Sequence, residues 1–209
     1  MNDSAKTDLG FVKYPVMESF STLQGEGYYS GTASFFIRLA GCDVGCVWCD
    51  VKESWTASED QYRTCEQITE LTNEFKGKTV VITGGEPAMY NLEPLIDALH
   101  QKGFRVHIET SGAYPVTGKP DWITLSPKKF KKALAEVLQS ANELKVVVFN
   151  KSDLEWAEEN AGKTGKDCLL YLQPEHSRHT EMSELIVPYI IQNPQWRLSL
   201  QTHKFIGIP

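Results

Sequence analysis

The chain has 209 residues, 41% hydrophobic and 23% charged, a composition typical of one globular domain with a sizeable core. Its net charge of −6 and the absence of a basic run argue against a protein that coats nucleic acid, and no apolar stretch is long enough to span a membrane. Because clustered cysteines do not resemble a secreted disulfide framework, we expect a cytoplasmic protein.

The N-terminus lacks a signal-peptide pattern, so we expect residues 1–14 to be an extension and residues 15–209 to form one domain. Apolar runs rich in β-branched and aromatic residues predict strands at Ala33–Leu39, Thr79–Thr83, Arg105–Glu109, Trp122–Leu125, Leu144–Phe149, Leu169–Leu172 and Trp196–Leu200. Helical periodicity predicts helices at Cys65–Phe75, Leu92–Lys102, Lys129–Gln139, Asp153–Asn160 and Thr180–Gln192, with Pro188 expected to kink or end the last one.

This alternation of strands and helices predicts an α/β fold with parallel strand pairing. The connection Ser111–Asp121 is too rich in glycine and proline to form a helix. The chain is also shorter than the roughly 250 residues of a complete eight-fold barrel. We therefore expect a partial, open (β/α) barrel with reduced helices.

A cysteine-rich loop follows the first predicted strand. Cys42, Cys46 and Cys49 are spaced Cys-x3-Cys-x2-Cys, and Gly45 allows a tight turn between them. Three thiolates on a four-iron cluster leave one iron without a protein ligand, where a cofactor can bind. A zinc site completed by Cys65, Cys168 or a distant histidine, and inert core cysteines, are the alternatives.

Polar and glycine-rich segments follow most of the predicted strands. They are Arg38, Thr83-Gly-Gly-Glu-Pro87, Glu109-Thr-Ser-Gly112, Ser126-Pro-Lys128, Gln173-Pro174 and Gln201-Thr-His-Lys204. In a parallel barrel these positions meet at the C-terminal mouth, where such folds carry their active sites. Upstream, the loop Leu23-Gln-Gly-Glu-Gly27 offers an amide that suits the edge of a guanine or pterin ring, although by itself it is equally a solvent loop.

Several of these residues have a second interpretation. Gly84-Gly85 allows a ligand to approach the backbone, or forms a structural turn. Glu86 either binds an ammonium group or holds its own loop. Arg38 pairs with an anionic substrate or with a structural carboxylate. Lys128 stands in a run of lysines that is typical of a solvated surface.

Together and in this order, these motifs closely resemble those of the 7-carboxy-7-deazaguanine synthase family of the radical S-adenosylmethionine (SAM) superfamily, from Met17 to the C-terminus. The resemblance implies a lyase of queuosine biosynthesis, a tRNA modification pathway. Such an enzyme converts 6-carboxy-5,6,7,8-tetrahydropterin to 7-carboxy-7-deazaguanine with loss of ammonia. It implies reductive cleavage of SAM at the open iron of a 4Fe-4S cluster, hydrogen abstraction from pterin C6, ring contraction and regeneration of SAM. It also implies Mg²⁺, a homodimer and an external electron donor such as a flavodoxin.

The resemblance also assigns residues to each group. Cys42, Cys46 and Cys49 would bind the cluster. The SAM contacts would be Trp48, Cys49, Asp50, Gly85, Glu86, Ser126, Pro127, Lys128 and Gln173. The substrate contacts would be Leu23, Gln24, Gly25, Arg38, Thr83, His203 and Pro209, although His203 is also typical of a satisfied core histidine. One position departs from the pattern: Val51 stands where the family has a threonine that binds Mg²⁺, and valine offers no oxygen, which puts Mg²⁺ in doubt.

Two other functions share the cluster motif. A radical SAM activase acts on a partner protein and would not need the loop Leu23–Gly27 or a closing C-terminus. A non-enzymatic module would bind zinc or a bare cluster only. Iron and sulfide analysis of anaerobically purified protein separates the second alternative from an enzyme.

Overall fold

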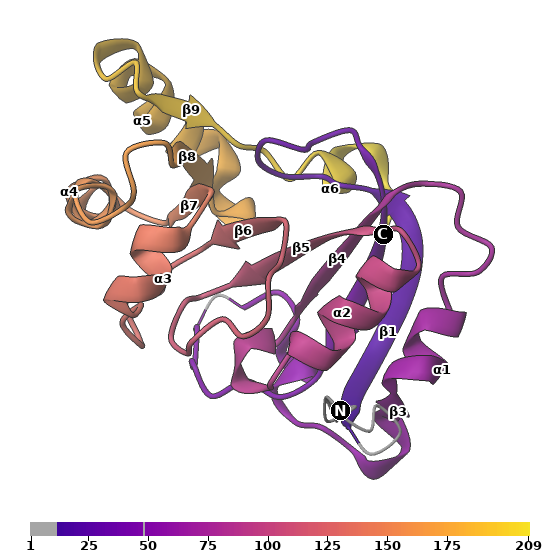
Figure 1. Cartoon of the computed structure of the whole chain (residues 1–209). Helices are drawn as coiled ribbons and strands as arrows, with labels where there is room; N and C mark the ends of the chain where they lie inside the picture. Colours follow the sequence, from indigo (N-terminus) through magenta and orange to yellow (C-terminus); the bar gives the residue numbers. More distant parts are fainter. Residues whose placement is uncertain (1–11, 48) are drawn as a thin grey trace.

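Parallel strands form the centre of the computed structural model, which describes residues 12–47 and 49–209 (Figure 1). The sheet has nine strands in the order β3-β1-β2-β4-β5-β6-β7-β8-β9. Its parallel members are β2 (Ala33–Leu39), β4 (Thr79–Gly84), β5 (Arg105–Thr110), β6 (Trp122–Leu125), β7 (Glu143–Val148), β8 (Leu169–Pro174) and β9 (Trp196–Leu198). All the predicted strands are confirmed, with ends that move by at most about two residues, the usual uncertainty of such boundaries.

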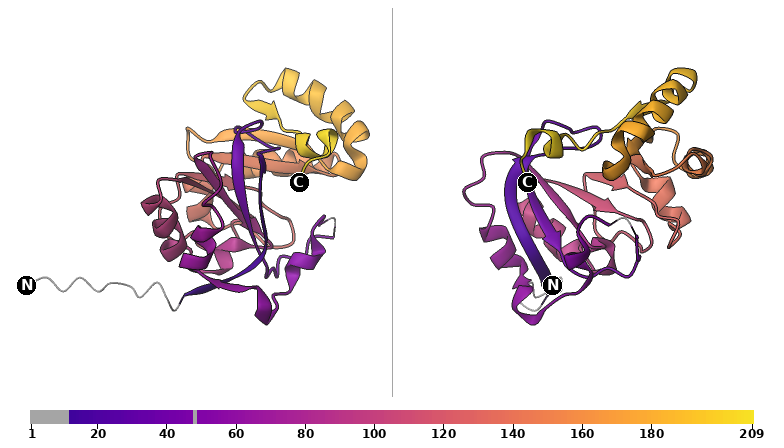
Figure 2. Two further views of the ribbon diagram at one scale, coloured as in Figure 1. Left: turned by 90° about the vertical axis from the view of Figure 1, so that its right-hand side faces the viewer. Right: turned by 180° about the vertical axis from the view of Figure 1, so that it is seen from behind.

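The predicted open architecture is confirmed as well. The two end strands, β3 and β9, do not pair with each other, so the described strands form a curved sheet that is not closed (Figures 1 and 2). The segment between β5 and β6 contains no helix, as its glycines and prolines predicted. The sheet is therefore open at one side.

Strand β1 (Lys13–Leu23) is a long element that the sequence pattern did not reveal. It pairs antiparallel with β2 and with the short β3 (Tyr62–Thr64). Apolar and polar residues do not alternate regularly along β1, because a bulge shifts the register between Val16 and Glu18. Pro15 also discourages a strand prediction. Residues 1–11 are not described, so the predicted extension 1–14 and single domain 15–209 stay predictions, although β1 begins at Lys13.

The helices agree with the predicted ones in position but not always in length. They are α1 (Cys65–Glu70), α2 (Glu93–Gln101), α3 (Ala135–Ser140), α4 (Ser152–Ala161) and α5 (His179–Gln192), with short 3-10 turns at Lys52–Trp55, Glu59–Gln61, Pro87–Met89 and His176–Arg178. Helix α1 ends at Glu70, where the Thr72 hydroxyl donates to the Thr69 carbonyl. Helix α3 begins at Ala135, because a β-bridge between Lys128 and Lys131 holds the preceding segment out of the helix.

Two features of the C-terminal part bear on the sequence-based expectations. Pro188, which was expected to kink or end its helix, does not end α5, which continues to Gln192, and a kink stays a prediction. Thr202–Ile206 forms a short helix, α6, which the sequence did not reveal and which is capped by Gly207 with φ of 69°. No helix of the described residues is long and apolar enough to cross a membrane.

Alternation along each strand separates an apolar face from a polar one. On β7, Leu144, Val146 and Val148 are buried in the hydrophobic core against the helices, whereas Lys145 and Val147 face the opposite side. Each fully buried aliphatic side chain of this kind contributes about 1.5–3 kcal/mol through burial. The hydrophobic core thus lies between the sheet and the helices, and the opposite face of the sheet contributes side chains to a cavity.

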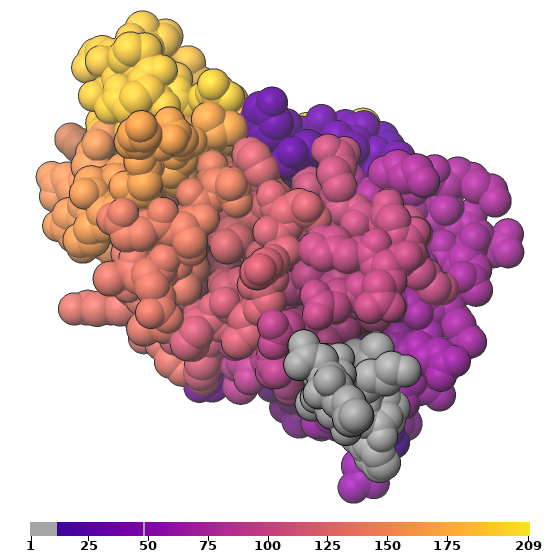
Figure 3. All heavy atoms as spheres, viewed as in Figure 1, coloured from indigo at the N-terminus to yellow at the C-terminus, as the bar shows by residue number. Residues whose placement is uncertain are grey.

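The C-terminal segment lies beside the connection between β1 and β2, although the two are far apart in the sequence (Figures 1 and 2). The backbone N–H and the hydroxyl of Thr202 both donate to the Gly25 carbonyl at 2.9 Å. In the space-filling view the late, yellow part of the chain borders this indigo connection (Figure 3). The chain end is thereby brought to the carboxyl side of the sheet.

Candidate active site

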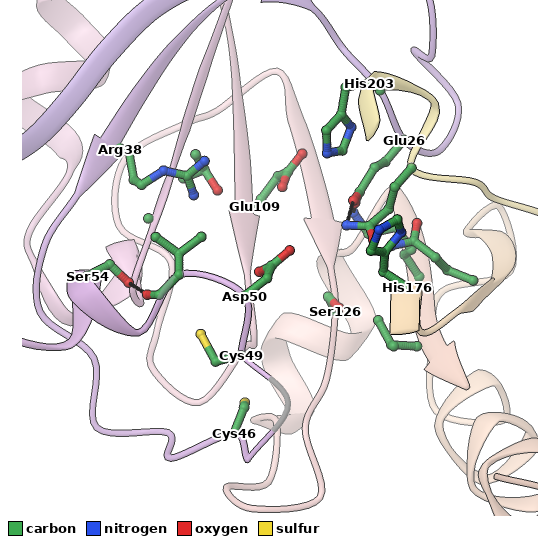
Figure 4. Close-up of a pocket in the computed structure, with 18 of the residues that line it drawn as sticks. Glu26, Arg38, Cys46, Cys49, Asp50, Ser54, Glu109, Ser126, His176 and His203 are labelled. Carbon is green, nitrogen blue, oxygen red and sulfur yellow. Dashed lines mark hydrogen bonds and ion pairs between the residues drawn. The ribbon is translucent and has the colours of Figure 1, made fainter. Parts of the chain in front are cut away.

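A cavity of about 360 Å³ lies at the carboxyl ends of the parallel strands. Its lining comes from β1, β2, β4, β5, β7 and β8, from the segment after β6, from the cysteine loop and from the C-terminal segment (Figure 4). The predicted site residues that line it are Leu23, Gln24, Gly25, Arg38, Cys42, Cys46, Cys49, Asp50, Thr83, Gly85, Ser126, Lys128, Gln173, His203 and Pro209. Chain topology therefore brings together what the motifs predicted separately. Trp48 lies outside the described residues, whereas Glu86 and Pro127 are buried and outside the lining.

The cysteine loop is closed on itself by backbone hydrogen bonds. The Cys42 N–H donates to the Trp55 carbonyl at 3.1 Å, and the Cys49 N–H donates to the Cys46 carbonyl at 3.1 Å. Gly45 has φ of 74°, which the turn requires and which other residues rarely adopt. The loop thereby turns the side chains of Cys46 and Cys49 toward one cavity (Figure 4).

The donor set of this loop, three cysteine thiols on one short segment, has the chemistry of an iron–sulfur cluster site. Within residues 12–47 and 49–209, no group of three histidine, cysteine, aspartate or glutamate side chains is arranged to hold one metal ion. In a cluster each cysteine binds a different iron, so the sulfurs need only surround the cluster. Burial raises the pKa of the Cys42 thiol, and the charges of Glu86 and Cys49 raise it further.

The glycine pair after β4 packs against the cysteine loop. A Cβ on Gly84 would lie 2.0 Å from the Leu39 carbonyl oxygen, and one on Gly85 would lie 2.3 Å from the Gly41 carbonyl oxygen. The Glu86 N–H donates to that same Gly41 carbonyl at 2.9 Å. Glycine is thus needed here for contact between two loops, and Gly85 also borders the cavity.

Glu86 is 1% exposed and holds its own loop. Its Oε1 accepts hydrogen bonds from the Ala88 N–H at 3.0 Å and from the Thr110 hydroxyl at 2.5 Å, and its Oε2 accepts from the Ser111 N–H at 2.7 Å and from the Ser111 hydroxyl. Of the two roles considered for Glu86, the structure displays the loop-holding one. A contact between Glu86 and SAM stays a prediction.

The polar residues after β6 and at the end of β8 are already ordered by hydrogen bonds. The Lys128 ammonium donates to both the carbonyl and the hydroxyl oxygen of Ser126 at 2.6 Å. The Gln173 side-chain oxygen accepts from the Ser199 hydroxyl at 2.7 Å. Burial lowers the pKa of Lys128, which faces the cavity and does not extend from the surface as the rest of its lysine run does.

The loop Leu23–Gly27 presents its amide to the cavity. The Gln24 side-chain nitrogen donates to Glu109 Oε1 at 2.9 Å, and the Gln24 side-chain oxygen accepts from the Glu26 N–H at 3.1 Å. A Cβ on Gly25 would lie 2.0 Å from His203 Nδ1, so the missing side chain makes room for the histidine ring. Burial lowers the pKa of His203.

Beneath this loop lies a buried ion pair between Glu26 and Lys145, with side chains only 14% and 5% exposed. Burial by itself raises the pKa of Glu26, but the attraction of Lys145 outweighs it and holds that pKa at about 2. The second carboxylate oxygen of Glu26 accepts from the Gln201 side chain at 2.8 Å. The sequence analysis did not single out Lys145, although a lysine inside an apolar strand is an unusual residue that signals a buried partner.

Arg38 displays the structural ion pair considered for it, and its pairing with a substrate stays a prediction. Its Nε donates to Glu18 Oε1 at 2.6 Å, so it does form a salt bridge within the sheet. The guanidinium group nevertheless extends into the cavity (Figure 4), next to Thr83 on the neighbouring strand. Phe20 and Phe36, which the sequence analysis missed, stack at 5.6 Å and form an aromatic wall close to it.

The far side of the cysteine loop contacts the C-terminal segment. Asp50 accepts from the Lys204 ammonium at 2.8 Å, and the Pro209 carbonyl oxygen accepts from the Thr22 hydroxyl at 3.1 Å. Val51 lines the cavity and has no side-chain oxygen, but its carbonyl accepts from the buried Ser54 hydroxyl at 2.6 Å. The chain end therefore closes the cavity between the cysteine loop and β1.

The sequence matches the model of the Radical SAM superfamily over residues 36–149. It is 52% identical to a 7-carboxy-7-deazaguanine synthase of Flavobacterium psychrophilum over 195 residues, which cover 93% of this chain and 92% of that protein. It is 48% identical to one of Synechocystis over 202 residues, covering 97% of each chain. Its fold is similar to the crystal structure of QueE from Escherichia coli, with a TM-score of 0.86, 36% identity and coverage of 93% of this chain and 96% of that one.

Proposed function

Since the chain belongs to the 7-carboxy-7-deazaguanine synthase family of the radical SAM superfamily, we propose that it converts 6-carboxy-5,6,7,8-tetrahydropterin to 7-carboxy-7-deazaguanine. The reaction releases ammonia and makes the protein a lyase of queuosine biosynthesis. One observation carries this proposal: the three-cysteine loop and the loop Leu23–Gly27 line the same cavity. An activase would have no need for a small-molecule pocket built from the second loop.

The cysteine loop would hold a 4Fe-4S cluster through Cys42, Cys46 and Cys49. A cluster with an open iron, together with SAM, supplies the radical chemistry that abstracts hydrogen in this superfamily. The chain's own task is to position SAM and to exclude competing reactions. Ser126 and Lys128 after β6 and Gln173 near the end of β8 already form hydrogen bonds, so these side chains need little further ordering when SAM binds.

The opposite half of the cavity suits the pterin. The Gln24 amide and the Glu109 carboxylate, already hydrogen-bonded to each other, offer acceptors to the N–H groups of the pyrimidine ring. The Arg38 guanidinium offers a cation to the substrate carboxylate. The stacked Phe20 and Phe36 rings exclude water from that side. Leu23, Gly25, Thr83, His203 and Pro209 complete this half.

Magnesium, the partners and the compartment belong to the proposal as well. A Mg²⁺ ion bound to substrate oxygens would find no side-chain oxygen at Val51, so we expect a site weaker than in relatives with threonine there. Reduction of the cluster requires an external one-electron donor such as a flavodoxin. A homodimer in the cytoplasm is the expected state.

Anaerobic turnover tests the proposed function. Protein with a reconstituted cluster is mixed with carboxytetrahydropterin, SAM, Mg²⁺ and a chemical reductant, and 7-carboxy-7-deazaguanine and ammonia are quantified. We expect both products in equal amounts, with SAM regenerated. Cys46→Ala protein treated identically is the control. Cluster-loaded protein that binds SAM but forms no product would disprove the assignment.

A further inference from the structure

Lys145 is a buried charge in the middle of a strand, and no motif accounts for it. Its neighbours Leu144 and Val146 belong to the hydrophobic core, while its own side chain, 5% exposed, points to the cavity and pairs with Glu26. Strand β7 and the connection after β1 are far apart in the sequence. Because a buried ion pair rarely gains stability over apolar packing, its presence beside the cavity calls for a role beyond folding.

The contacts of Glu26 lead from Lys145 to the pterin side of the cavity. The Glu26 N–H donates to the Gln24 side-chain oxygen at 3.1 Å, and the Gln24 side-chain nitrogen donates to Glu109 at 2.9 Å. On the other side the Glu26 carboxylate accepts a hydrogen bond from Gln201, which immediately precedes α6, the helix that contains His203. The Glu26 backbone therefore holds the amide of Gln24, while the Glu26 carboxylate, paired with Lys145, holds the residue before the closing helix.

The charges around this pair make Lys145 hard to replace. Glu26, Glu109 and Glu143 all attract its ammonium. Glu26 is also close to the charges of His203, Asp50 and Lys128. Without Lys145, burial would dominate and raise the pKa of Glu26, so that a carboxylate that accepts hydrogen bonds would bind a proton and become a donor.

We propose that Lys145 is the positioning residue of the pterin half of the site. It holds Glu26 ionised and in place, and through Glu26 it holds Gln24 and Glu109 in the arrangement that binds the substrate ring. This inference rests on the proposed function. Lys145 itself takes no part in the radical chemistry.

Substitution of Lys145 by methionine, which preserves length and removes charge, tests the proposal. The probe is 6-carboxypterin, a fluorescent oxidised analogue of the substrate, titrated into cluster-loaded protein without reductant. In Lys145→Met we expect pterin binding to weaken at least about tenfold, the usual consequence of leaving one partner of a buried pair alone. The dissociation constant of SAM, measured in the same protein, should stay within about twofold, since Ser126 and Gln173 are held by hydrogen bonds to Lys128 and Ser199.

The pH profile gives a readout that a merely structural role would not change. In the wild type, Glu26 stays ionised at neutral pH because its pKa is held at about 2. In Lys145→Met the raised pKa lets Glu26 lose its proton only as pH rises, so pterin binding should recover as the pH is raised above neutral. The wild type should show no such recovery through Glu26.

Further variants separate the effect of the charge of Lys145 from the effect of its size and position. Lys145→Met/Glu26→Gln removes both charges and should bind 6-carboxypterin more tightly than Lys145→Met alone, while Lys145→Arg should keep part of the affinity. Lys102→Met is the control, because Lys102 donates to Thr69 and Asn73 far from the cavity. If Lys145→Met does not fold, Glu26→Gln and Lys145→Arg carry the same comparison.

Three results would overturn the proposal: unchanged pterin affinity in Lys145→Met, an equal loss of pterin and SAM binding, or a double variant no better than the single one. These differ from failure of the proposed function. In that case the wild type itself would neither bind 6-carboxypterin nor form product.

Discussion

The Arg38→Ala variant tests whether Arg38, which forms a salt bridge within the sheet, also binds the substrate carboxylate. Arg38 uses one nitrogen, Nε, to bind Glu18, and its guanidinium group extends into the cavity. If that group pairs with the substrate carboxylate, its removal leaves a desolvated charge without a partner, at a cost of about 2–4 kcal/mol. At about 1.4 kcal/mol for each factor of ten, the KM for carboxytetrahydropterin should rise roughly 30- to 700-fold.

The same change should affect stability little. The Arg38 side chain is 19% exposed and that of Glu18 is 45% exposed, so their pair belongs to the class that contributes about 0–1 kcal/mol. For a domain of this size such a loss lowers the melting temperature by at most about 4 °C. Steady-state kinetics at saturating SAM and a thermal melt together separate the two roles.

Glu18→Gln is the matched control for Arg38→Ala. It removes the structural partner and leaves the guanidinium in place, so we expect a nearly unchanged KM. The reasoning is refuted if Arg38→Ala has the KM of the wild type and a lowered melting temperature. In that case the only role of Arg38 is its salt bridge with Glu18 within the sheet.

Three further predictions concern the cluster, the metal and the chain end. Cys46→Ala should abolish iron incorporation while Cys65→Ala, in a buried cysteine of α1, should not; normal iron content in Cys46→Ala would contradict the cluster assignment. Val51→Thr should lower the Mg²⁺ concentration for half-maximal activity without changing SAM binding, because it restores an oxygen ligand, and an identical Mg²⁺ response would exclude position 51 from the metal site. One residue added after Pro209, which lines the cavity, should cut activity sharply and leave the melting temperature intact; full activity would show that the chain end does not touch substrate.

What the sequence by itself determined is mostly local. β-Branched and aromatic runs between glycine-rich segments predicted every parallel strand that the structure describes, because these residues favour extended backbone. The spacing of Cys42, Cys46 and Cys49 predicted one loop wrapped around one compact metal cluster, since so short a segment cannot bridge distant parts of the fold. Parallel pairing then placed the polar strand ends at one mouth, as observed.

Only the tertiary structure decided which side chains meet. Glu26 and Lys145 are 119 residues apart, and neither the alternation of β7 nor the loop motif indicates that they pair. The bulge in β1 sets Glu18 opposite Arg38. The docking of α6 on Gly25 fixes His203. These contacts depend on strand register and on the curvature of the sheet, which result from packing of the whole chain, so no local pattern encodes them.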